Sequence, residues 1–90
     1  MSEGEKIYKE ICEKYIKSKY EFPTVLHIDK KSFLELRLEM CKYFSVEIQS
    51  REIIEFRIER GDFDSYAYIL GMTVKILKQT EDKVIIVGYD

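Results

Sequence analysis

The sequence predicts one α+β domain, in which two helices pack on one face of a mostly antiparallel sheet of about four to five strands. Three observations lead to this fold class. Apolar residues near the start of the chain recur at the helical period. The second half contains short apolar runs, several of which alternate at period two. The 90 residues suffice for one core and contain no linker rich in Pro, Gly or Ser, so residues 1–90 are expected to form a single domain.

The first helix is expected over residues 3–20. Apolar side chains such as Ile7 and Ile11 fill one half of the helical wheel, and lysines and glutamates fill the other. Ser2 and Glu5 have the spacing of a capping box, which places the start of the helix where the apolar period begins.

A second helix is expected over residues 33–44, with Asp29 or Ser32 as its cap. This segment alternates as a strand would, but its Leu, Glu, Arg and Met residues favour a helix. As a helix, the segment places Arg37 in the middle of an apolar face.

Strands are expected where apolar residues alternate or form short runs, at residues 24–28, 46–49, 54–58, 66–78 and 84–87. Gly71 predicts a bulge or a bend within the fourth of these segments. Residues 84–87 are apolar on both faces, so this strand is expected inside the sheet rather than at its edge. The short connections favour antiparallel pairing.

Charge and composition exclude several classes of protein. The net charge is −2, from 15 basic and 17 acidic side chains spread along the chain. A nucleic-acid binder usually carries a clear basic excess, so nucleic acid is not an expected partner. No apolar run is long enough to span a membrane, no apolar run typical of a signal sequence follows the first residues, and there are only two cysteines. We therefore expect a cytoplasmic protein.

No residue pattern predicts catalysis, a cofactor or a metal centre. His27 is the only histidine and is expected to be a strand residue rather than a base. Cys12 and Cys41 fall on predicted core faces, where a thiol behaves as a small apolar group. Residues 62–64 resemble the start of a calcium loop, but the required glycine and glutamate further on are absent. The sequence therefore predicts a protein that is not an enzyme; catalysis through His27 or a cysteine is the least favoured alternative.

Aromatic residues are the most informative feature for function. The chain has seven tyrosines and five phenylalanines, and tyrosine is enriched at protein interfaces. Phe63, Tyr66 and Tyr68 cluster near an acidic turn, where they decorate a sheet face or form a binding or oligomer surface. Arg37 has two interpretations as well, a structural one, which we prefer, and a contact with a partner. These four residues are the interaction candidates.

Two segments support a family resemblance. Tyr68–Val74, followed after a turn by Val84–Gly88, resembles a hairpin of tailed-phage proteins, found in the peripheral domain of phage major capsid proteins and in small phage open reading frames. Phe22–Ile28, which runs into a helix, is similar to the strand-then-helix opening of such small proteins. The chain is far too short for a capsid subunit. The resemblance implies a viral origin and a non-enzymatic role, and it carries over no functional residue.

Two functional hypotheses follow. The first is a small phage-encoded protein that binds a protein partner or itself, as a virion accessory or as an inhibitor of a host factor in the host cytoplasm. The alternative is a nucleic-acid-binding protein that uses a helix face bearing Lys9, Lys14 and Lys17, although the glutamates between them argue against it.

Overall fold

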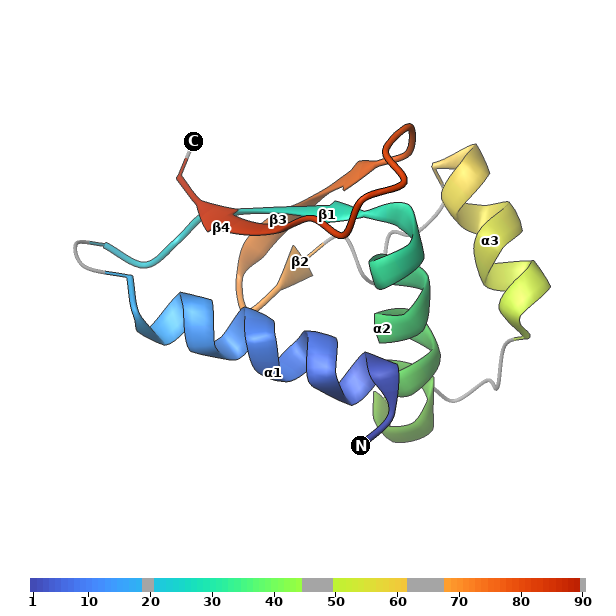
Figure 1. Ribbon diagram of the computed structural model, residues 1–90, viewed down its shortest axis with the longest axis horizontal. Coiled ribbons are helices and arrows are strands. Elements are labelled where there is room, and N and C mark those ends of the chain that lie inside the picture. The colour runs from blue at the N-terminus through green and yellow to red at the C-terminus, as the bar shows by residue number, and fades with distance from the viewer. Residues whose placement is uncertain (19–20, 45–49, 62–67, 90) are drawn as a thin grey trace.

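The computed structural model describes residues 1–18, 21–44, 50–61 and 68–89, and for residues 41–44 it describes the backbone alone. Along the described residues the helices and strands follow one another in the order α1 (Glu3–Ile16), β1 (Val25–Asp29), α2 (Lys30–Phe44), α3 (Arg51–Arg60), β2 (Tyr68–Ile69), β3 (Met72–Leu77) and β4 (Ile85–Gly88). The strands form one sheet with the order β2-β3-β1-β4. Figure 1 shows α1 and α2 on one face of this sheet, and α3 packs against α2.

The predicted α+β class is confirmed, but the helix number and one strand pairing differ from the prediction. The described residues contain three helices rather than two. β1 pairs antiparallel with β4 and parallel with β3, with Leu26 between Val87 on one side and Val74 on the other. The parallel pair arises because two helices separate β1 from β3 in the chain, so the connection crosses over instead of turning back.

Helix α1 begins as predicted and ends earlier. The Ser2 hydroxyl accepts a hydrogen bond from the Glu5 amide at 3.1 Å, which caps the first turn. The helix ends at Ile16, whose side chain is largely exposed. Gly4 brings α1 close to α2, since a Cβ at this position would lie 2.4 Å from the Glu35 carbonyl oxygen.

Helix α2 confirms the helical prediction for residues 33–44. It begins directly after Asp29, whose carboxylate accepts a hydrogen bond from the Ser32 amide at 3.0 Å, so Asp29 rather than Ser32 caps it. Phe33 and Leu36 are fully buried, and Arg37 is 4% exposed. The apolar face therefore includes Arg37, as the helical wheel predicted.

The strand predicted over residues 54–58 is wrong, because this segment lies in α3. Ser50 caps the helix by accepting from the Ile53 amide at 3.3 Å, and Gly61 ends it with a positive φ of 73°. Ile54 and Ile58, four residues apart, are buried, whereas Phe56 is exposed. A strand would have placed all three side chains on one face, so the burial of Ile54 and Ile58 without Phe56 is the helical pattern.

The remaining strand predictions have mixed outcomes. β1 confirms the first predicted strand, and residues 46–49 lie outside the described residues. The single stretch over 66–78 is wrong in part, because β2 and β3 form a hairpin whose turn residues, Leu70 and Gly71, both have positive φ. The bend predicted at Gly71 is thus confirmed. The position predicted for residues 84–87 inside the sheet is wrong, because β4 is an outermost strand of the described sheet.

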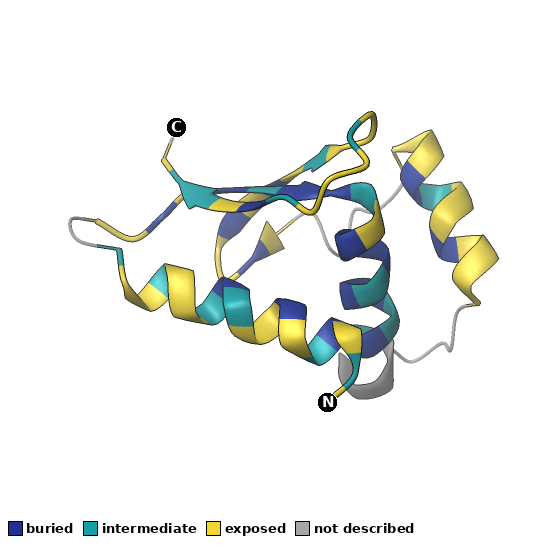
Figure 2. Cartoon of the chain, viewed as in Figure 1, coloured by how far each residue is buried: buried dark blue, intermediate teal, exposed yellow. Residues whose placement is uncertain are grey.

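The core lies between the sheet and the helices. Figure 2 shows buried segments of α1 and α2 facing buried segments of the strands. Thirteen buried side chains from all the helices and strands form one cluster: Ile7, Ile11, Leu26, Ile28, Phe33, Leu34, Leu36, Ile54, Ile58, Ile69, Met72, Val74 and Ile85. Among the described helices, none combines the length and apolar character needed to cross a bilayer.

Candidate protein-interaction edge of the sheet

The outermost strand β4 directs alternate peptide groups toward β1 and away from it. The Asp29 amide donates to the Val84 carbonyl oxygen at 3.0 Å, and the Thr24 amide donates to that of Gly88 at 2.9 Å. Residues 84 and 88 therefore face β1. Because adjacent residues of a strand direct their peptide groups to opposite sides, those of Ile85 and Val87 face outward.

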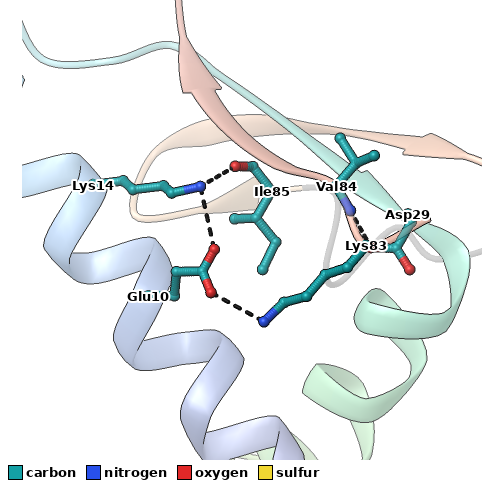
Figure 3. Close-up of polar contacts among 6 residues, drawn as sticks. All are labelled: Glu10, Lys14, Asp29, Lys83, Val84 and Ile85. Carbon is teal, nitrogen blue, oxygen red and sulfur yellow. Dashed lines mark hydrogen bonds and ion pairs between the residues drawn. The ribbon is translucent and has the colours of Figure 1, made fainter.

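The first half of this edge is tied to helix α1. Lys14 donates a hydrogen bond from its ammonium group to the outward-facing carbonyl of Ile85. The same ammonium group lies 3.2 Å from the carboxylate of Glu10, which also pairs with Lys83 at 3.1 Å. Figure 3 shows this chain of contacts running from α1 to the start of β4. A lysine at a strand edge is a common means of preventing further strand pairing.

Asp29 fixes the entry of β4 from the opposite side. Its two carboxylate oxygens accept from two different amides, Val84 at 2.9 Å and Ser32 at 3.0 Å. One side chain therefore caps α2 and also takes the place of a strand carbonyl opposite Val84 (Figure 3). Asp29 is 3% exposed, so both contacts are largely shielded from water.

Hydrogen bonds lower the pKa of both carboxylates at this entry. Burial alone would raise the pKa of Asp29, but the hydrogen bonds from Ser32 and from the Val84 amide outweigh it, and the pKa falls below its usual range. Burial acts in the same direction on Glu10, and the hydrogen bonds from Lys83 and Lys14 again lower the pKa. Both carboxylates are therefore ionised at neutral pH.

The second half of β4 is open, and we call residues 86–88 the open edge. Val87 faces outward, and no described residue pairs with its N–H or C=O. Ile86 is 55% exposed and lies beside His27, whose other neighbour in the sheet is Lys75. An unpaired peptide group beside an exposed β-branched side chain is what an additional strand requires.

The structure does not bring the four predicted interaction residues together. Phe63 and Tyr66 lie outside the described residues. Tyr68 is 66% exposed on β2, at the opposite end of the sheet order from β4. Arg37 is buried in α2, so its side chain offers little surface to a partner.

The predicted thiol positions show no reactive arrangement within the described residues. Cys12 is half-buried and lines an apolar cavity of about 680 Å³ between α1 and α2, together with Tyr8 and Met40. Burial, and then the neighbouring Cys12, raise the pKa of Tyr8. The Cys41 side chain lies outside the described residues, and the part of the chain that is described holds no cluster of groups suited to a metal ion. The cavity lining is mostly apolar, so it does not indicate a particular ligand.

The lysine face proposed for nucleic acid is partly occupied. Lys9 on α1 and Lys17 at the C-cap of the helix are exposed, but Lys14 is held by Glu10 and the Ile85 carbonyl. The three lysines therefore do not act as one free cationic surface.

Sequence reasoning missed the open edge because it placed residues 84–87 inside the sheet. Apolar residues on both faces indicate a strand covered on both sides, but they do not give its place in the strand order. Residue types favoured the interior placement as well, because residues 84–89 carry no charged side chain and an exposed edge usually has one.

Comparison with protein-family models, with curated proteins and with solved structures finds no match to this chain.

Proposed function

We propose that this domain binds proteins by strand addition, in which an extended segment of a partner pairs with the open edge of β4. The observation that carries the proposal is the outward-facing peptide group of Val87, which has no partner among the described residues. Peptide recognition at a sheet edge gains affinity from main-chain hydrogen bonds and specificity from alternate side chains.

The surroundings of Val87 support this mode of binding. Ile86 offers an exposed β-branched side chain on the sheet face opposite the core, and Val87 packs partly against the core on the other face. One face of β4 is thus packed on the core, and the strand presents both hydrogen-bonding groups and an apolar side chain to an added strand. The other outermost strand, β2, has only two residues and offers a shorter template.

This proposal retains the protein-binding role expected from the sequence and moves it to a different surface. Tyr68 belongs to the opposite edge, and Arg37 is buried. The tailed-phage origin, and the role as virion accessory or host-factor inhibitor, stay predictions from the sequence resemblance.

The test uses a generic extended peptide of alternating valine and threonine, blocked at both ends. We expect the peptide to shift the NMR amide signals of Ile85 and Val87 and to slow hydrogen exchange at both amides. The matched control is the same peptide with N-methyl groups on the residues that face the edge. If the methylated peptide binds equally well, strand addition is wrong.

Two variants at the same position separate the amide from the side chain. Val87→Pro removes the outward-facing N–H without breaking a hydrogen bond inside the chain, as proline permits on an edge strand. Val87→Ala keeps the N–H and shortens the side chain. We expect Val87→Pro to weaken peptide binding at least about tenfold and Val87→Ala to weaken it only a few-fold, with circular dichroism confirming that both variants fold.

A further inference from the structure

We propose that the strand accepted by β4 is β4 of a second copy of this chain, paired antiparallel about a two-fold axis at Ile86. The inference rests on the proposed function and names its partner. The resulting dimer would join the two sheets edge to edge into one continuous sheet of eight strands, twice the four of each copy.

The hydrogen-bonding groups of β4 match those of an inverted copy of itself. With Ile86 on the axis, Ile85 of each copy lies opposite Val87 of the other. Both residues direct their peptide groups outward, so the N–H of Val87 meets the carbonyl of Ile85 and the N–H of Ile85 meets the carbonyl of Val87. A two-fold interface is self-complementary by construction, and this register fulfils that condition.

The side chains match in the same register. Ile86 would face its own counterpart at a non-hydrogen-bonded position, where opposite side chains of an antiparallel pair are closest. Its 55% exposure then becomes contact between two β-branched side chains. Gly88 lies opposite Val84 and offers no side chain that could obstruct the approach.

The absence of charge, together with the self-matching register, favours a second copy as the occupant. Residues 84–89 carry no charged side chain, so self-pairing sets no like charges opposite each other. Lys83, at the margin, is already paired with Glu10 of its own chain. An identical strand therefore meets no repulsion over residues 84–88, and it also supplies matching outward peptide groups and an apolar counterpart for the exposed Ile86.

Lys14 limits the strength of the pairing without preventing it. Its ammonium group already donates a hydrogen bond to the Ile85 carbonyl oxygen, but this oxygen has a second lone pair that can accept from an added strand. The strand has four residues, so the interface falls among the small ones, below roughly 1,200 Å², that characterise transient complexes. We therefore expect a weak dimer with a dissociation constant on the order of 10–100 μM.

The first experiment measures the mass of the full-length chain by sedimentation equilibrium up to about 1 mM, well above that dissociation constant. The wild-type mass should rise toward twice the 10.8 kDa of one chain. Ile86→Lys should remain monomeric, because two lysines would face each other on the axis. The matched control is Ile53→Lys, at an isoleucine of similar exposure (48%) on α3, and it should dimerise like the wild type.

Charge complementation tests the two-fold axis itself. Ile86→Lys and Ile86→Glu should each be monomeric alone, and mixing the two should restore dimers by placing opposite charges face to face. A mixture that stays monomeric, or an Ile53→Lys chain that also loses dimerisation, would overturn the proposal.

The proposed function and this inference can fail separately. If the wild-type chain stays monomeric up to 1 mM while the generic peptide still shifts Ile85 and Val87, the second copy is wrong and strand addition stands. If neither the chain nor the peptide binds the edge, both are wrong.

Discussion

The two halves of the β4 edge differ in how their hydrogen-bonding groups are satisfied. At the first half, Asp29 accepts the Val84 amide on the side that faces β1, and Lys14 donates to the Ile85 carbonyl on the outward side. At the second half, the peptide group of Val87 faces outward with no described partner. The strand residues are similar in both halves, so the side chains supplied by neighbouring elements determine where the edge is closed.

The largest effect on stability is expected from Asp29→Ala, at the first half of the β4 edge (residues 84–85), which we call the closed half. This change removes the cap of α2 and leaves the Val84 amide unpaired, and together these losses should lower the free energy of unfolding by about 2–4 kcal/mol. Urea denaturation measures the change. Asp82→Ala, at an exposed position in the preceding turn, is the control and should cost less than about 0.5 kcal/mol. A loss as small as this in Asp29→Ala would show that the carboxylate does not hold the entry of β4.

The pH dependence of stability should come in part from the same carboxylate. The folded protein lowers the pKa of Asp29 below its ordinary value of 3.8, so the stabilisation is complete above that value and is lost as the pH falls through the lowered pKa. Asp29→Asn cannot titrate. We therefore expect the difference in the free energy of unfolding between wild type and Asp29→Asn to narrow as the pH falls from about 6 to about 2. Urea denaturation of both proteins at each pH measures this difference. A constant difference would contradict the role assigned to this ionisation.

Helices α2 and α3 show how far the sequence can predict the fold. Residues 34–40 and 54–59 both alternate apolar and charged side chains, and both lie in helices. Helix-forming residue types gave the right prediction for the first segment, whereas the β-branched isoleucines of the second favoured a strand. The better signals were the caps, Ser50 before the helix and Gly61 after it, because they mark the ends of a helix independently of its period.

The position of a strand in its sheet depends on contacts distant in sequence. The apolar run of β4 predicted a strand, but β1 separates it from β3, its predecessor in the chain. Leu70 presents a similar limit, since its positive φ of 52° belongs to a hairpin turn that Asn or Gly would normally signal. The open edge could therefore not be located from residue types alone.

Removing the Lys14 ammonium group from the closed half is expected to have an intermediate effect on stability. Lys14→Met removes the hydrogen bond to Ile85 and the ion pair with Glu10, both partly exposed, so the free energy of unfolding should fall by only about 0.2–1 kcal/mol. The freed carbonyl should strengthen self-association several-fold, measured by sedimentation. Lys9→Met changes the same charge at an exposed position of the same helix, outside this contact, and should leave both quantities unaltered. Equal behaviour of the two variants would mean that Lys14 does not restrict the edge.

The smallest effect is expected from Lys83→Ala, which tests how much the outer ion pair contributes to closing the edge. Lys83 and Glu10 keep 52% and 34% of their side-chain surface exposed, so water and salt weaken their attraction. We expect a loss of about 0.2–1 kcal/mol in low salt that shrinks further in about 1 M salt, where charges are screened within roughly 3 Å. Lys75→Ala, on the exposed face of β3, is the control for a changed net charge. Because Lys14 still holds Ile85 in this variant, self-association should not change, and a stronger dimer would show that the outer pair, rather than Lys14, limits access to β4.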